Sequence, residues 1–516
     1  MIKERPLLAR GWYFILGLAV LTGVAFRFMH LPGKFFWWDE AASSLRMSGH
    51  FWDGIANEAP RGVAFPARDF IARYEKIEGS ALDTIRGLRR EEPQLTPLYF
   101  LGLRGWAYVF GPGVTSLRAF SAILSVASLG LLYWLCQILF SSTKIAATTT
   151  AIAALSPLNL LYAQEARPYA LMVFLTLLAS LVLLKGLGTR RRWPCFAYGA
   201  VCVAGIYTHL LFALVPIAHL TYLFANRASL APRDLRRYGL AGILALASAL
   251  PWTWVIATNY AQFEKTVGWT ASPLAFSDLI STWAGHLLWP FFDIGLKEDI
   301  RSQFGELVAC LAVFVPFSLL AMVYTVRRAP RRAWTFILLL QLITFAAMAI
   351  PDVVLGGQRT TVARYLLPFH LGLVMCAGFL LADLKHRFSP ALVLALLVAQ
   401  TWSCNLILQN GNWWHKGLLN HARVRAAADR LGGDEEYLVI LAEPSPDLLT
   451  LGRVQPDRTY FLIDSDAFRA GTLVANAVDP SLGVGRLQSF GEFLVYTSAS
   501  GAPLPGVADF HVAGRE

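Results

Sequence analysis

Two adjacent acidic residues, Asp39 and Glu40, stand directly after the first long apolar stretch of the chain, residues 12–29. Four aromatic residues come immediately before them: Phe35-Phe36-Trp37-Trp38. Carboxylates beside aromatic rings at the edge of a membrane are costly to keep there, so they commonly mark a functional site. One of the two could act as the general base that removes the proton of an acceptor hydroxyl, because partial burial would raise its pKa into a useful range. An aromatic belt at the interface, followed by ordinary loop acids, is the alternative.

A second group of reactive side chains lies in the short segment 164–168, between two apolar stretches. It contains Glu165 and Arg167, and Tyr169 follows it. A guanidinium can bind a phosphate through two parallel N–H bonds, so this loop predicts an anion site on the same side of the membrane as Asp39. The alternative is an ion pair between Glu165 and Arg167 that ties a tight loop.

A third group lies in residues 356–368, which contain Arg359, Arg364 and Tyr365 just before another apolar stretch. Two arginines at headgroup depth could neutralise a lipid phosphate. They could equally be interfacial anchors whose apolar stems lie in the lipid. His209, which interrupts an apolar stretch on the same side, fits a structural role as well as a binding role.

The composition indicates a membrane protein. Of 516 residues, 56% are hydrophobic and 15% are charged, and the mean hydropathy is +0.49. Soluble domains have about a quarter charged residues. Several apolar runs have about 18 residues or more, enough to cross roughly 30 Å of hydrocarbon. We therefore predict a polytopic α-helical membrane protein, and we read the net charge of +11 as topology information rather than as a nucleic-acid signal.

The basic residues set the predicted topology. Six segments assigned to the cytoplasm hold 18 Lys and Arg and three acids, whereas three intervening external loops hold six Lys and Arg and seven acids. About eleven spans are predicted, with an uncleaved first span whose N-terminus is cytoplasmic, so the C-terminal tail is external. The spans are 12–29, 116–140, 145–163, 169–187, 195–208, 210–225, 239–256, 303–326, 334–350, 365–383 and 388–405.

Residues 96–111 look like a further span but carry Arg104 in the middle, and a span here would invert every later loop. We therefore predict an interfacial helix within a large external loop, residues 30–115. The predicted domains are a transmembrane domain at 1–405 and a small external α/β domain at 406–516. The second follows from apolar strand-like runs at 437–441, 460–463 and 493–496 and a helical pattern at 422–431.

The six cysteines show no CxxC spacing, so the sequence predicts neither a zinc site nor a disulfide framework. No metal ligands are assigned.

Several short motifs occur in a fixed order along the chain. After the acid pair come Pro97-Leu98-Tyr99, Leu117-Arg118, Ser156-Pro157, Gln164-Glu165-Ala166-Arg167-Pro168-Tyr169, Thr208-His209 and Arg364-Tyr365-Leu366-Leu367-Pro368. This order resembles the bacterial members of the dolichyl-phosphate-mannose-protein mannosyltransferase family, which have the GT-C fold and include the lipid A aminoarabinose transferase as a relative. The likeness covers roughly 1–405. Many relatives have His-Pro-Pro where this chain has Leu95-Thr96-Pro97.

The resemblance implies an inverting glycosyltransferase of the bacterial inner membrane, with its active site facing the periplasm. The donor would be a polyprenyl-phosphate sugar and the acceptor a glycan, a lipid or a protein; membrane lipids are partners and nucleic acid is not. Asp39 would be the base, Glu40 and Glu165 would shape the pocket, and Arg167 and Arg364 would hold the phosphate. Further substrate-binding residues would be Tyr99, Tyr169, His209, Arg359 and Tyr365. No cofactor is obligatory, and a divalent metal ion is possible.

Two other functions compete with this prediction. A transporter or flippase of lipid-linked sugars would have charges buried in the middle of its spans and repeat symmetry, whereas the acids here gather on one external side. A non-catalytic protein of envelope-glycan assembly would keep the fold without the chemistry. Loss of transfer in Asp39→Asn, with folding preserved, would separate an enzyme from such a protein.

Overall fold

The structure is a computed structural model, and it describes residues 6–52, 64–295, 303–384, 389–411, 437–441, 449–450, 453, 459–462, 486–490 and 493–497. The chain forms two compact units. The first, here called the helical unit, comprises Met1–Leu31, Leu88–Gly102 and Leu117–Asn410. The second, here called the mixed unit, comprises Pro32–Gly87, Leu103–Ser116 and Gly411–Glu516.

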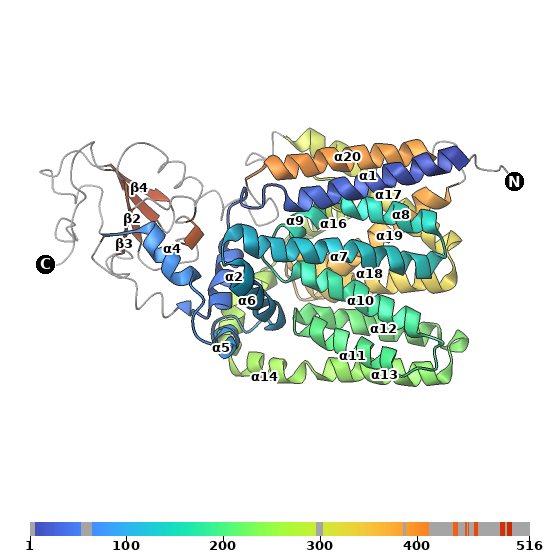
Figure 1. Cartoon of the computed structure of the whole chain (residues 1–516), viewed down its shortest axis with the longest axis horizontal. Helices are drawn as coiled ribbons and strands as arrows, with labels where there is room; N and C mark the ends of the chain where they lie inside the picture. Colours follow the sequence, from blue (N-terminus) through green and yellow to red (C-terminus); the bar gives the residue numbers. More distant parts are fainter. Residues whose placement is uncertain are drawn as a thin grey trace, which may run out of the picture. The chain divides into compact units, whose positions relative to one another are not determined.

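Among the described residues, eight helices are long and apolar enough to cross a membrane. They are α1 (Pro6–Phe28), α7 (Val114–Phe140), α10 (Tyr169–Gly186), α13 with α14 (Pro232–Ala247 and Leu250–Thr258), α17 (Phe304–Arg328), α18 (Arg331–Val354), η6 with α19 (Ala363–Leu366 and Leu367–Asp383) and α20 (Ser389–Gln409). A ninth span results if α8 (Thr143–Ala154) and α9 (Pro157–Ala163), which are bent by 61°, are taken as one. The long helices of this unit run roughly parallel (Figure 1).

The multi-pass character is confirmed, but the count of eleven spans is not. The two other predicted spans fall on α11 (Trp193–Ile206) and on η1 (Leu210–Ala213) with α12 (Leu214–Ala225). These are apolar but shorter than 18 residues, and a helix of 18 residues rises only about 27 Å. The physical reason for the difference is therefore the length of these helices, not their composition.

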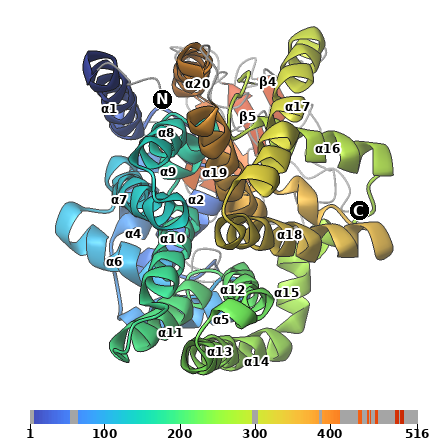
Figure 2. The same cartoon turned by 90° about the vertical axis from the view of Figure 1, so that its right-hand side faces the viewer.

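Helix α19 forms the centre of the helical unit. Every residue from Leu367 to Ala382 is buried, and the helix packs against α8, α17 and α18. The view along the helices shows α19 near the middle of this packing (Figure 2). Among the described candidate spans, the one that contains α19 has the largest buried share, so α19 contacts other helices rather than lipid along most of its length.

The end of α1 is fastened to the break between α8 and α9. Pro157 stands at the start of α9 and has no N–H to continue the hydrogen bonds of α8. The buried guanidinium of Arg27 donates to the carbonyls of Ala154 (2.6 Å) and Ala153 (3.4 Å). The amide of Gln164 donates to two carbonyls in and just after the last turn of α1, those of Phe26 (2.9 Å) and Met29 (2.7 Å). These bonds satisfy carbonyls that helix ends leave open, and they fix the loop that begins at Gln164.

The mixed unit contains α2 (Trp38–Ser48), α4 (Ala67–Glu75) and a five-stranded sheet. The strands are β1 (Ala64–Pro66), β2 (Tyr437–Leu441), β3 (Thr459–Leu462), β4 (Arg486–Phe490) and β5 (Phe493–Thr497), in the order β1-β3-β2-β5-β4. Strands β2 and β3 are parallel and the other pairs are antiparallel. Strands β2, β3 and β5 lie at the three predicted runs, whereas the predicted helix 422–431 lies outside the described residues, so the α/β domain at 406–516 stays a prediction.

Two further helices, α5 and α6, lie between α4 and α7 in the sequence. Helix α5 covers Ala81–Glu91, and α6 covers Leu98–Phe110 where the interfacial helix is predicted. The side chain of Arg104 on α6 is buried. Its guanidinium donates to the carbonyls of Met47 (3.0 Å), Glu78 (2.8 Å) and Gly79 (2.8 Å). Arg104 therefore binds backbone inside the mixed unit, which explains how an arginine is accommodated within an apolar run.

Candidate functional site

Side chains from four separate segments of the helical unit meet in one group, here called the arginine–tyrosine cluster. The segments are α9, the loop from Gln164 to Pro168 with the start of α10, the residue before η1, and η6. The members are Tyr162, Glu165, Arg167, Tyr169, His209, Arg364 and Tyr365. Six of these were predicted as site residues from the sequence, and the structure brings them together.

A chain of aromatic rings runs through the cluster. The rings of Tyr162 and Tyr169 meet edge to face with centroids 5.4 Å apart. The ring of His209 lies 6.0 Å from that of Tyr169 and 6.2 Å from that of Tyr365. Tyr162 and Tyr169 also pack with Leu158, Ala363 and Leu367 in a small buried core. This core explains why α9, α10 and η6 present their polar groups to the same place.

The two arginines approach these rings from different segments. The guanidinium carbon of Arg364 lies 5.9 Å from the ring centroid of Tyr169 and 5.7 Å from that of Tyr365. Arg167 is 4% exposed, and its positive charge and that of Arg364 both act on His209. Aromatic faces stabilise a guanidinium that has lost water, so the rings of Tyr169 and Tyr365 can hold Arg364 at the end of an apolar helix.

His209 is held as a neutral hydrogen-bond donor. Its Nδ1 accepts the backbone N–H of Leu211 at 3.2 Å, as the N-cap of η1, so in the neutral ring the proton is on Nε2. Burial, together with the positive charges of Arg167 and Arg364, lowers the pKa of His209 to about 3. The ring therefore adds no positive charge at neutral pH and offers an N–H group.

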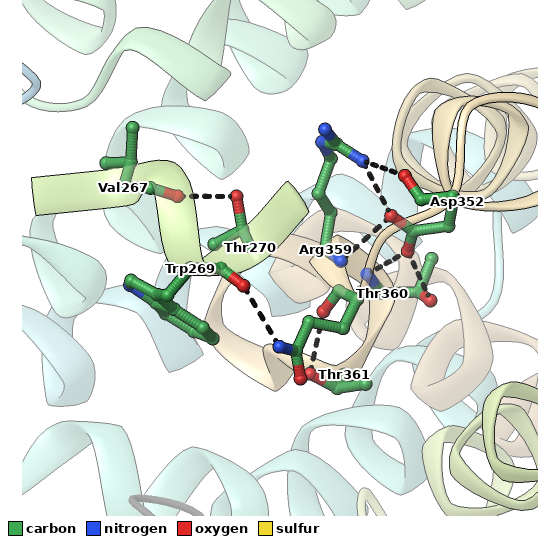
Figure 3. A network of polar contacts seen from close by, with 9 residues as sticks. Val267, Trp269, Thr270, Asp352, Arg359, Thr360 and Thr361 are labelled. Carbon is green, nitrogen blue, oxygen red and sulfur yellow. Dashed lines mark hydrogen bonds and ion pairs between the residues drawn. The ribbon is translucent and has the colours of Figure 1, made fainter. Parts of the chain in front are cut away.

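The loop before Arg364 is built around Asp352, near the end of α18 (Figure 3). One carboxylate oxygen accepts the backbone N–H and the guanidinium of Arg359, at 2.9 and 3.0 Å. The other oxygen accepts the backbone N–H and the hydroxyl of Thr360, at 2.7 and 2.8 Å. Gly357 has a φ of +149°, and a Cβ there would collide with both Arg359 and Asp352. The acid thus fixes the chain that leads into η6 and to Arg364.

Arg359, which is predicted to bind substrate, is not among the residues of the arginine–tyrosine cluster. It forms an ion pair with the buried carboxylate of Asp352, and this pairing gives it a structural task in the loop. Tyr99 is also placed apart from the predicted role: its side chain is buried between α6 and α7, and its hydroxyl lies 3.1 Å from that of Ser121. The start of α6 does contact the segment beside His209, because the N–H of Leu98 donates to the carbonyl of Tyr207 at 2.8 Å.

Asp39 and Glu40 occupy the first turn of α2, in the mixed unit. Helix N-termini favour negative charge, which stabilises an acid pair at this position. The Asp39 side chain is partly exposed and that of Glu40 is buried. The hydroxyl of Ser43 donates to the backbone carbonyl of Asp39 at 2.8 Å. The side chain of Asp39 is thus accessible to solvent, while its backbone is fixed by the hydrogen bond from Ser43.

Two residues of this arrangement were not predicted. Tyr162 belongs to the cluster. It stands seven residues before Tyr169, on the other side of a five-residue loop, and this spacing could have indicated that the two lie close together. Asp352 organises the loop, and an acid at the end of an apolar helix, seven residues before an arginine, could have indicated it. Within the described parts of the chain, no group of three or more His, Cys, Asp or Glu side chains could hold a metal ion.

The depressed pKa of His209 gives a prediction about acid stability. The unfolded chain protonates its histidine near pH 6.5 and the folded chain only near pH 3, so this stabilisation is complete above pH 6.5 and is lost as the pH falls toward 3. The free energy of unfolding of the parent protein should fall between pH 7.5 and pH 5. We expect this fall to be smaller in His209→Gln, by up to about 2 kcal/mol. Thermal melts in detergent at the two pH values measure this.

The matched control is His50→Gln, since His50 belongs to the mixed unit and is not a member of the cluster. An equal acid-induced drop in the parent protein and in His209→Gln would contradict the assignment of a neutral, buried ring.

Residues 92–254 match the family model described as dolichyl-phosphate-mannose-protein mannosyltransferase. This segment contains Tyr99, Glu165, Arg167, Tyr169 and His209. The resemblance predicted from the motifs is thereby confirmed over this part of the chain. No curated protein sequence matches.

Similarity to solved structures identifies the fold of the chain. A crystal structure of ArnT from Cupriavidus metallidurans bound to undecaprenyl phosphate is 12% identical and has a TM-score of 0.51, with 96% of this chain and all of that chain covered. The archaeal oligosaccharyltransferase AglB from Archaeoglobus fulgidus, in complex with an inhibitory peptide and a dolichol-phosphate, is 14% identical with a TM-score of 0.45. The match covers 83% of this chain and 58% of AglB. The likeness to ArnT confirms the GT-C-like membrane fold.

Proposed function

We propose that this protein is an inverting glycosyltransferase that moves a sugar from a polyprenyl-phosphate donor to an acceptor hydroxyl at the periplasmic face of the bacterial inner membrane. The observation that carries the proposal is the arginine–tyrosine cluster. Arg167 and Arg364 come from loops far apart in the sequence and meet around one set of aromatic rings. Such a pairing of cations at the ends of apolar helices suits an anion that must stay at headgroup depth.

The charge of the cluster favours a phosphate. Arg167 and Arg364 supply two positive charges, Glu165 supplies one negative charge, and His209 is neutral. A planar guanidinium binds phosphate through two parallel N–H bonds. The tyrosine hydroxyls and the Nε2–H of His209 add neutral donors. These groups stabilise the negative charge that appears on the departing phosphate as the glycosidic bond breaks.

The transfer itself exchanges one C–O bond for another. The acceptor oxygen attacks the anomeric carbon, and the bond from this carbon to the phosphate oxygen breaks, so that the products are the glycosylated acceptor and polyprenyl phosphate. The proton of the acceptor hydroxyl passes to the carboxylate of Asp39, and Glu40 and Glu165 have the accessory roles that the resemblance implies. Displacement from the opposite face inverts the anomeric centre, as a single base on that face requires. Since polyprenyl phosphate leaves as a stabilised anion, the scheme needs no nucleotide and no obligatory metal ion.

The likeness to ArnT supports the lipid part of the proposal, because the ArnT structure holds undecaprenyl phosphate. The experiment that tests the whole proposal has two arms. Purified protein in detergent is given synthetic polyprenyl-phosphate sugars, and release of polyprenyl phosphate is measured in the presence of envelope extract from a strain that lacks the gene. In parallel, the envelope glycans of that strain are compared with those of its parent.

We expect one glycan to lose a sugar in the deletion strain and the purified protein to restore it. Movement of intact donor across vesicles without its consumption would support a flippase instead. Restoration of the glycan by Asp39→Asn would support a non-catalytic assembly protein.

Orientation gives a separate prediction. In a Cys310→Ala background, whose five other cysteines are buried, single cysteines are placed at the exposed positions Arg86 and Arg191. We expect an impermeant maleimide to label position 86 in intact spheroplasts, and position 191 only after permeabilisation, because the arginine-rich loops stay in the cytoplasm. Labelling of 191 but not of 86 in intact cells would place the cluster on the cytoplasmic side.

A further inference from the structure

The C-terminal segment contributes the side chain of Arg453 to the surroundings of α2. Its Nε donates to Glu75, the last residue of α4, at 2.8 Å. One terminal nitrogen donates to the hydroxyl of Ser44 on α2 at 3.1 Å. The guanidinium carbon lies 4.0 Å from the ring centroid of Phe36. The side chain is only 9% exposed, so these contacts are made largely out of water, where they are stronger.

Other parts of the same segment make independent contacts nearby. The hydroxyl of the buried Thr450 donates to the backbone carbonyl of Phe36. Strand β3 pairs with β1, and β1 leads directly into α4. At the other end of α2, the hydroxyl of Ser48 donates to the carbonyl of Tyr74 on α4 at 3.0 Å. Helix α2 is therefore held at its start, its middle and its end.

The spacing of these contacts relates Arg453 to the acid pair. Ser44 follows Glu40 by four residues within α2, so the two share a face of the helix. Phe36 lies two residues before the helix begins. Arg453 thus contacts residues on both sides of Glu40 along the chain. Rotation of α2 about its axis would break the bond to Ser44 and the stacking on Phe36 together.

We infer that Arg453 is a positioning residue for Asp39 and Glu40, and that the C-terminal segment serves the reaction by fixing the orientation of α2. The inference rests on the proposed function, because it assumes that the acid pair is catalytic. A displacement of about 1 Å at a reacting group can cost about 10²-fold in rate. Loss of the Arg453 contacts should therefore reduce turnover more than donor binding.

The test compares Arg453→Gln and Arg453→Lys with the parent protein in the transfer assay. We expect Arg453→Gln to lower kcat by about 10- to 100-fold while the KM for the lipid donor changes by less than about threefold. Arg453→Lys should be intermediate, since an ammonium can meet Glu75 but lacks the fork that also reaches Ser44. The matched control is Arg86→Gln, an exposed ion-paired arginine of the same unit, which should leave kcat unchanged.

A second variant covers the case in which Arg453→Gln fails to fold. The exchange of both partners, Glu75→Arg with Arg453→Glu, keeps the ion pair and should recover more kcat than either single change. Wild-type kcat in Arg453→Gln, or a loss that appears only in KM, would overturn the positioning role. Asp39→Asn distinguishes the two proposals: if it stays active, the assignment of the acid pair fails first, whereas an inactive Asp39→Asn beside a fully active Arg453→Gln refutes the positioning role alone.

Discussion

Replacing Asp39 by asparagine is expected to abolish sugar transfer while the protein stays folded. Asparagine has nearly the same shape but cannot take the proton of the acceptor hydroxyl, and general base catalysis is typically worth about 10²- to 10⁴-fold in rate. The hydrogen bond that the backbone carbonyl of Asp39 accepts from Ser43 does not involve the side chain, so the substitution keeps it. Initial rates of polyprenyl phosphate release, with melting temperatures in the same detergent, measure both parts of the expectation.

The matched control for this variant is Asp69→Asn. Asp69 is also an acid in the first turn of a helix of the mixed unit, and its side chain is exposed. It should retain full activity, since it shares the helix position of Asp39 but not the proposed role. A rate above about a tenth of the parent value in Asp39→Asn would exclude Asp39 as the base.

The second large effect is expected at Arg167 and Arg364. If both hold the donor phosphate, Arg→Ala at either position should weaken donor use by about 10- to 100-fold, which corresponds to one charge-assisted hydrogen-bonded contact. Arg→Lys should weaken it less, because the charge remains while the paired N–H bonds are lost. The double variant should lose less than the product of the single losses, because groups that bind one ligand are coupled.

Two donors with the same polyprenyl tail and different sugars make this test specific. The ratio of kcat/KM values for the two sugars should not change in any of these variants. Arg359→Lys is the contrast, because Arg359 is paired with Asp352 and its substitution should lower the melting temperature rather than donor use. A changed sugar preference in Arg167→Ala at constant donor affinity would assign that residue to the sugar.

Much of the helical architecture could be predicted because hydropathy is a local property. The apolar runs locate every described long helix of the helical unit, and the residues of the cluster lie at the ends of these runs or in the short polar loops between them. Charge bias further predicts that the loops at Glu165, His209 and Arg364 share one side. Their convergence could not be predicted, because it depends on which helices pack against α10 and α19, and those contacts join residues far apart in the chain.

Arg359 and Arg364 show where local reasoning fails. They lie five residues apart in one loop and carry the same charge, so the sequence suggests one role for both. The structure separates them because Asp352 captures the first, together with Thr360, and the turn that follows carries the second to Tyr169. The pairing of β1 with β3 was unpredictable for a similar reason: β1 has three residues and includes Pro66, which a strand tolerates only at an edge.

The bonds that Arg27 and Gln164 make between α1 and the α8–α9 break also constrain how the protein is made. Helix α1 leaves the ribosome before α8, so the buried guanidinium of Arg27 can bind the carbonyls of Ala153 and Ala154 only after α8 has been synthesised. The carbonyls of Phe26 and Met29 gain their partner later still, because the amide of Gln164 is synthesised after α8. Until then the nascent chain must keep a charged group and open carbonyls at the water-facing edge of the bilayer, since hydrocarbon cannot satisfy them. Insertion of α1 and its fixation against α8 and α9 are thus separate events, and the second requires that the chain has been synthesised through Gln164.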